Sequence, residues 1–87
     1  MKISVIIPTL NEASNITRLI NSLWKYGQNQ IAEIIVVDSP ESTDNIAEVA
    51  QNLKAISLTS LKKGRGFQMN YGATFATGDI LYFIHAD

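Results

Sequence analysis

Two aspartates, Asp38 and Asp87, each follow a run of apolar and β-branched residues in this 87-residue chain. If these runs are buried parallel strands, both carboxylates lie at strand carboxyl ends, where open α/β sheets bind ligands. Thr9 and Glu12 follow a third such run at residues 3–7. Carboxylates accept hydrogen bonds from base N–H groups and ribose hydroxyls, and a carboxylate with a divalent cation holds a diphosphate. This pattern suits a nucleotide.

The densest basic stretch, Lys-Lys-Gly-Arg-Gly at residues 62–66, precedes a candidate helix. Lys63 and Arg65 would reach the same pocket from the side, and a guanidinium forks onto phosphate oxygens. The alternative is an ordinary solvated loop. His85 is equally open, because a histidine near a strand end either contacts a metal or substrate or is a hydrogen-bonded structural residue.

Other polar residues have a structural interpretation. Asn11 and Glu12 suit the start of a first helix, and Ser42, Thr43 and Asp44 suit the start of a second. Short polar side chains cap the free N–H groups there, and a carboxylate is favoured by the helix dipole. Capping and ligand binding therefore compete as explanations for both groups.

Apolar periodicity predicts alternating strands and helices. Strands are expected at residues 3–7, with Pro8 ending the first, at 31–37, at 55–59 and from Gly78 to Asp87; helices are expected at 11–27, 43–53 and 67–77. The β-α-β-α-β-α-β order predicts an α/β fold, a Rossmann-like open parallel sheet in one domain over residues 1–87. The expected strand order, 3-2-1-4, brings the ends of strands one, two and four together. Gly72 and nearby alanines would let the third helix approach the sheet closely.

The composition, with 46% hydrophobic and 17% charged residues, is that of a globular protein. A net charge of -1 provides no electrostatic attraction for duplex nucleic acid. The chain has no cysteine, which excludes disulfides and thiolate metal sites. No apolar run approaches the roughly 20 residues that cross a bilayer, and the N-terminus lacks a cleavage pattern, so a cytoplasmic location is expected.

Two phosphate-binding motifs are missing. Gly64-Arg65-Gly66 reads G-x-G, but Met69 occupies the third glycine position and the loop follows the third expected strand. No G-x-x-x-x-G-K-[ST] occurs, which excludes a P-loop. The loop after the first expected strand contains no glycine, which argues against a dinucleotide-dependent oxidoreductase.

Segments along the whole chain resemble glycosyltransferase family 2, inverting nucleotide-sugar transferases with a GT-A fold. The resemblance rests on residues 4–12 (SVIIPTLNE), 33–38 (EIIVVD), 63–73 (KGRGFQMNYGA) and 76–87 (ATGDILYFIHAD). It implies that the chain is the N-terminal, donor-binding part of that fold. It further implies that the nucleotide pocket is lined by Pro8, Thr9 and Glu12, that Asp38 contacts the base, and that Arg65 lies near the base or phosphates.

The same resemblance implies a metal site for Mg²⁺ or Mn²⁺. Asp87 would be the final carboxylate of the family's D-x-D motif and would bind the metal through the diphosphate of a donor such as a UDP-sugar. Here the motif reads His85-Ala86-Asp87, so a histidine replaces one carboxylate and would be the second protein ligand. The loop at residues 39–44 also departs from the family, since it lacks the usual glycine and has one extra residue.

The family's acceptor-binding region and its general base have no counterpart in these residues. An inverting transfer needs that base to take the proton of the acceptor hydroxyl, so the chain is expected to be inactive alone. The alternative is a catalytically inactive structural fragment. A sheet cut after its fourth strand would expose apolar faces and an edge, which favours a homo-oligomer.

Overall fold

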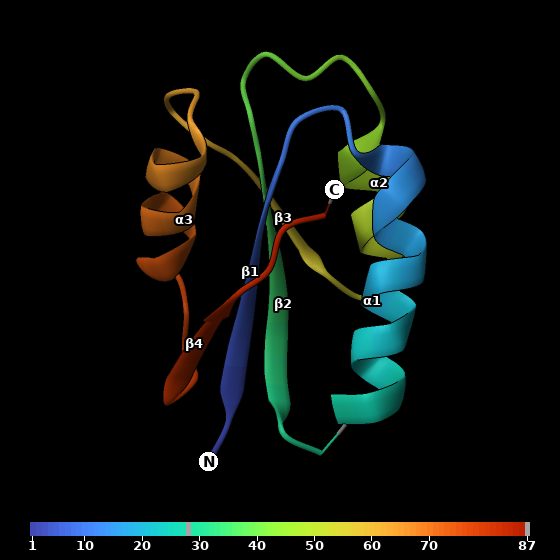
Figure 1. Cartoon of the computed structure of the whole chain (residues 1–87), viewed down its shortest axis with the longest axis vertical. Helices are drawn as coiled ribbons and strands as arrows, with labels where there is room; N and C mark the ends of the chain where they lie inside the picture. Colours follow the sequence, from blue (N-terminus) through green and yellow to red (C-terminus); the bar gives the residue numbers. More distant parts are fainter. Residues whose placement is uncertain (28, 87) are drawn as a thin grey trace.

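The protein is described by a computed structural model, which covers residues 1–27 and 29–86. It is a parallel sheet between two helical layers (Figure 1), with α1 and α2 on one face and α3 on the other. In chain order the elements are β1 (Ile3–Thr9), α1 (Ala13–Gly27), β2 (Ile31–Asp38), α2 (Ile46–Asn52), β3 (Ile56–Thr59), α3 (Arg65–Ala73) and β4 (Ile80–Phe83). The sheet order β3-β2-β1-β4 confirms the predicted topology.

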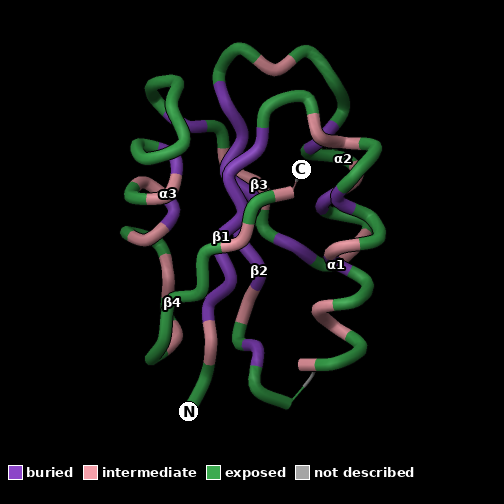
Figure 2. Tube along the Cα trace, in the orientation of Figure 1, coloured by how far each residue is buried: buried purple, intermediate pink, exposed green. Residues whose placement is uncertain are grey.

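The core lies on the two central strands, β1 and β2. Successive strand side chains point to opposite faces, so Val5 and Ile7 pack beneath α1 and α2 while Ile6 packs beneath α3. Figure 2 shows the buried residues gathered along these strands. Burial on both faces explains why the two strands are almost continuously apolar. The longest helix, α1, has 15 residues, and none of the helices described is long and apolar enough to cross a bilayer.

Gly72 sets the distance between α3 and the sheet. A Cβ atom at this position would lie 2.6 Å from Val37 Cγ2 and 2.9 Å from Ile6 Cγ2, closer than packed carbon atoms approach. Only glycine therefore permits this spacing, as the sequence predicts. The helix starts two residues earlier than expected, at Arg65, and this first turn lies near the carboxyl ends of the central strands.

The amino end of the sheet is held by a polar cluster around Glu33. Its Oε2 accepts hydrogen bonds from Ser4 Oγ at 2.7 Å, from the Thr77 N–H at 2.6 Å and from Thr77 Oγ1 at 2.9 Å. Burial alone would raise the pKa of Glu33, but the Ser4 and Thr77 hydrogen bonds outweigh it and hold the pKa below its ordinary value. The cluster ties the α3–β4 connection to β1 and β2.

Pro8 does not end the first strand, which continues to Thr9. The Ile84 N–H donates to Ile6 O, so the even-numbered residues of β1 direct their backbone groups toward β4. The β1–β4 ladder has its last pair at Ile6 and Phe83, so the missing N–H of Pro8 falls beyond it. Proline therefore interrupts no hydrogen bond at this position.

The last predicted strand is shorter and more exposed than expected. It ends at Phe83, and its four residues are 41% to 55% exposed. The reason is its position at the edge of the sheet, where, among the residues that the structure describes, it pairs with β1 alone. The following segment leaves the sheet, and Ile84 and Ala86 pack against the core beneath α1 and α2. Asp87 lies outside the described residues.

Candidate functional site

An open pocket of about 600 Å³ lies at the carboxyl ends of β1 and β2. Three loops and one turn of helix form its walls, together with the segment that follows β4. Its lining residues are Pro8, Thr9, Leu10, Glu12, Ser39, Glu41, Lys63, Gly64, Arg65, Gln68 and Ala86. The pocket thus occupies the edge of the sheet at which this architecture binds ligands.

Asp38 lies beside this pocket as a nearly buried carboxylate, 6% exposed. Its Oδ1 accepts hydrogen bonds from Thr9 Oγ1 at 2.8 Å and from Ser42 Oγ at 2.7 Å. Its Oδ2 accepts none from the described residues. No buried side-chain nitrogen or oxygen in that part of the chain lacks a hydrogen-bond partner. The carboxylate is oriented through one oxygen and offers the other as an acceptor.

The loops after β1 and β2 hold each other, which corrects the expected helix caps. Asn11 adopts a left-handed φ of 53° and does not cap α1. Its Oδ1 accepts the Thr43 N–H at 2.8 Å, and its N–H donates to Ser42 Oγ at 3.0 Å. Neither Ser42 nor Thr43 caps α2, because that helix begins after Asn45, which makes no side-chain cap hydrogen bond.

Asp44 does cap a helix, but the other one. Its Oδ2 accepts the N–H of Ala13 at 2.8 Å, at the start of α1 instead of α2. Neighbouring parallel strands bring their following loops together, so a side chain of one loop reaches the helix that starts in the other. The crosslinks fix the loop residues around Asp38.

The basic stretch forms the opposite wall of the pocket. Gly64 has a φ of 116°, a backbone conformation that favours glycine, and it immediately precedes α3. Arg65 lines the pocket, and Lys63 Nζ lies 3.5 Å from Glu41 Oε2 across the mouth. Both members of this ion pair are exposed, so it contributes little stability. This wall thus presents two basic side chains, Lys63 and Arg65, with the acidic Glu41 beside Lys63.

Gln68 is a pocket residue that the sequence reasoning missed. It is only 4% exposed, and its Nε2 donates to Thr9 O at 2.9 Å and to Val37 O at 2.8 Å. The amide thereby joins the ends of β1 and β2. One signal was available, since Gln68 precedes Gly72 by one helical turn and shares the face that packs on the sheet.

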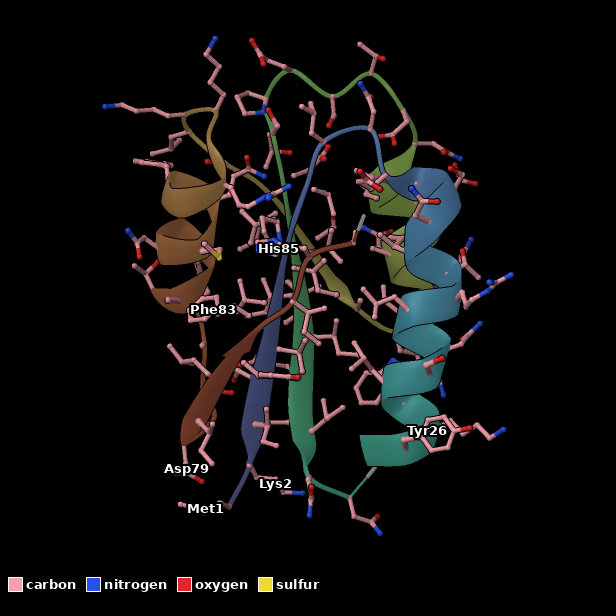
Figure 3. The ribbon with its side chains drawn as sticks, in the orientation of Figure 1. Met1, Lys2, Tyr26, Asp79, Phe83 and His85 are labelled. Carbon is pink, nitrogen blue, oxygen red and sulfur yellow. The ribbon has the colours of Figure 1, made fainter. Side chains whose placement is uncertain are left out.

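The predicted metal ligands are only partly placed. His85 is exposed on the segment after β4 (Figure 3), and Asp87 lies outside the described residues. Ala86, between them, lines the pocket. Residues 1–27 and 29–86 contain no group of three or more histidine, cysteine or acidic side chains placed to hold a metal. A divalent ion such as Mg²⁺ commonly takes one or two protein ligands and completes its coordination shell with phosphate and water oxygens. Two protein ligands would therefore be enough.

The structure therefore brings Pro8, Thr9, Glu12 and Arg65 around one pocket and places Asp38 against its wall through Thr9. The walls carry both signs of charge, with the acidic Glu12 and Glu41 and the basic Lys63 and Arg65. Chemically, the arrangement offers carboxylate acceptors and cationic donors around one pocket. It suits a ligand that has both hydrogen-bond donors and negative charge.

The chain is similar to several known proteins. Residues 4–87 match the model of the family described as glycosyl transferase family 2. The chain is 38% identical to an uncharacterized glycosyltransferase of Nostoc sp. and 38% identical to a dolichol-phosphate mannosyltransferase of Pyrococcus furiosus. All of this chain aligns in both cases, but it spans only 28% and 26% of those proteins.

Among solved structures, the chain resembles glucosyl-3-phosphoglycerate synthase of Mycobacterium tuberculosis. One such structure contains Mn²⁺, UDP and glucosyl-3-phosphoglycerate, and another contains Mg²⁺ and UDP. Each has a TM-score of 0.86 and 30% identity over 99% of this chain, which corresponds to 33% of the longer protein.

Proposed function

The chain belongs to glycosyl transferase family 2, and from that premise we propose that it binds the nucleoside diphosphate of a nucleotide-sugar donor. The supporting observation is the pocket at the ends of β1 and β2, with Asp38 oriented beside it by Thr9 and Ser42. The related synthase binds UDP, so we take a UDP-sugar as the model donor.

In this proposal each wall of the pocket meets one part of the donor. Oδ2 of Asp38, which accepts no hydrogen bond from the described residues, would accept one from the base, and Pro8, Thr9 and Glu12 would contact the nucleoside. Arg65 lies at the entrance, where its guanidinium would approach the diphosphate. The sugar would then project outward, away from the strand ends.

We assign Asp87 and His85 to a Mg²⁺ or Mn²⁺ ion bound with the diphosphate. When bound, the metal neutralises charge on the leaving nucleoside diphosphate. The support is twofold: Ala86, between the two ligands, lines the pocket, and the related synthase has been solved with both ions. The proposal requires only two protein ligands, with phosphate oxygens supplying others.

Donor binding is the part of the transferase reaction that we assign to these residues. The chain spans about a third or less of the proteins compared above. We assign neither an acceptor site nor a general base to its residues. Calorimetric titration of UDP, with and without Mn²⁺, tests the proposal. Saturable binding that strengthens with Mn²⁺ is expected; a folded sample that binds neither UDP nor UDP-glucose would refute it.

A second candidate function, self-association, is favoured by strand β4. Its alternate backbone groups face β1, so the N–H and C=O groups of Leu81 and Phe83 point away from the sheet. Both side chains are also more than 40% exposed. Because two copies of β4 placed antiparallel would satisfy these groups reciprocally, we propose that the partner is a second copy of this chain.

A further inference from the structure

Gln68 reaches the strand ends from α3, on the face of the sheet opposite the Asp38 side chain. Val37 packs beneath α3 and Ile7 beneath α1 and α2. Because successive strand side chains alternate between faces, Asp38 and Thr9 both point toward α1 and α2. The Gln68 amide instead binds the backbone of these strands, with Nε2 at 2.9 Å from Thr9 O and 2.8 Å from Val37 O.

Both hydrogens of this amide are used within the protein. Two carbonyl oxygens require a donor between them, which identifies the nitrogen side of the amide, and the NH₂ group has two hydrogens to donate. The side chain is only 4% exposed, so water competes little for these hydrogen bonds. The amide therefore holds the ends of β1 and β2 at a fixed spacing.

This amide bridge lies where the two strands stop pairing. Thr9 and Asp38 are the last pair of the β1–β2 ladder. A ladder opens most easily at its end, because the last pair has neighbours on one side only. The hydrogen bond from Thr9 Oγ1 to Asp38 Oδ1 crosses this pair at 2.8 Å, and a further separation of about 1 Å would break it.

We propose that Gln68 is a positioning residue for Asp38. The inference rests on the proposed nucleotide pocket, in which Asp38 accepts a hydrogen bond from the base. By holding the strand ends together, the Gln68 amide keeps the Thr9 hydroxyl on Asp38 Oδ1 and so keeps the carboxylate in its orientation. Gln68 acts through the backbone and needs no contact with the nucleotide. It makes nucleotide affinity depend on the position of α3.

The competing explanation is that Gln68 only stabilises the fold. The buried residues of α3 are Gln68 and Gly72, so Gln68 is the buried residue of this helix that has a side chain. An apolar side chain would fill this position without the cost of burying an amide. What the amide adds is the pair of hydrogen bonds to the strand ends, and the experiment asks whether they reach Asp38.

The first measurement needs no nucleotide. Gln68→Met removes both hydrogen bonds and keeps a side chain of similar length. The ¹³C NMR signal of the Asp38 carboxyl group should move in this variant, whereas that of Glu33, at the other end of the sheet, should not. Asn70→Met is the matched control, because Asn70 is an exposed residue of the same helix, and it should move neither signal. An unmoved Asp38 signal in Gln68→Met, or equal movement of Asp38 and Glu33, would overturn the inference.

Calorimetric titration with UDP tests the consequence for binding. Gln68→Met should weaken UDP binding about three- to tenfold in the parent chain. In a Thr9→Val background the hydroxyl is absent, so the same substitution should weaken binding less than about twofold, because residues that act through one contact are not additive. Equal losses in the two backgrounds would overturn the inference.

If Gln68→Met does not fold, the parent chain decides. Coupling between two sites is reciprocal, so a bridge that strengthens UDP binding must itself be strengthened by UDP. Saturating UDP should therefore slow hydrogen exchange of the Gln68 side-chain NH₂ group about three- to tenfold, while that of Asn70 stays the same. Unchanged exchange at Gln68 would overturn the inference.

Failure of the proposed function would have a different signature. A folded parent chain that binds neither UDP nor UDP-glucose would overturn that function, and with it the effect of Gln68 on affinity. A parent chain that binds UDP, with the affinity and the Asp38 signal both unchanged in Gln68→Met, would overturn only the role of Gln68.

Discussion

Substituting Gly72 with alanine should move α3 away from the sheet and weaken both stability and nucleotide binding. The new Cβ would lie 2.6 Å from Val37 Cγ2 and 2.9 Å from Ile6 Cγ2. Val37 and Ile6 are fully buried and β-branched, so their methyl groups have little freedom to rotate away. The helix or the strands must shift to accommodate the added carbon.

Two opposing effects set the size of the change. Overpacking a well-packed core costs about 1–3 kcal/mol, while replacing glycine by alanine within a helix returns about 1 kcal/mol. We therefore expect Gly72→Ala to lower the free energy of unfolding by up to about 2 kcal/mol, which corresponds to a fall in Tm of up to roughly 16 °C for a domain of this size. The displaced helix also carries Gln68, so UDP binding should weaken.

Gly66→Ala is the matched control, since it lies in the same helix and a Cβ there would meet no atom within 4 Å. It should leave stability unchanged or raise it by up to about 1 kcal/mol. Urea unfolding of both variants, followed by calorimetry with UDP, makes the comparison. Equal stability of the two variants would refute the claim that α3 needs glycine for its approach to the sheet.

Three other changes test separate parts of the account. Asp38→Asn should weaken UDP binding about tenfold or more, because a charged acceptor is lost, whereas Asp79→Asn at the far end of the sheet should not. Because the pKa of Glu33 is lowered in the fold, the stability that its carboxylate confers is full above about pH 4.5 and is lost as the pH falls through the folded pKa. Urea unfolding should therefore show that the difference in unfolding free energy between the parent chain and Glu33→Gln becomes smaller at acidic pH. A difference that stays constant with pH would contradict this prediction. Leu81→Lys should shift light scattering toward the monomer if β4 pairs with a second copy, while a monomeric parent chain at tens of micromolar would remove that proposal.

Much of the fold was predictable because it depends on local patterns. The apolar runs of the central strands and the apolar periodicity of α1 predict a chain of alternating strands and helices. Short connections then favour the observed strand order in the sheet. The close approach of α3 was also predictable, since a glycine inside a helix suggests a packing reason at Gly72. The ends of the strands were less predictable. Strand β1 continues through Pro8 because the hydrogen-bonded ladder between β1 and β4 ends before this residue.

The errors concern contacts between segments far apart in the sequence. Spacing assigned Asp44 to the helix that follows it, whereas the structure pairs it with Ala13 of α1. The apolar composition of β4 suggested that it is buried. Whether other segments pack over a strand, however, cannot be read from the sequence of the strand itself. For the same reason Gln68 appeared to be an ordinary helical residue, and only the fold shows it joining two strands.

The most direct test of nucleotide binding in this pocket is an NMR map of UDP binding to the ¹⁵N-labelled chain, in a buffer that contains Mg²⁺ and no Mn²⁺. If the pocket binds the nucleotide, the shifts will be concentrated at the carboxyl ends of β1 and β2 and at the start of α3, with the largest changes near Thr9, Asp38 and Gln68. Shifts centred instead on the groove between β4 and α1, near Tyr26 and Tyr82, or no shifts at saturating UDP, would contradict it.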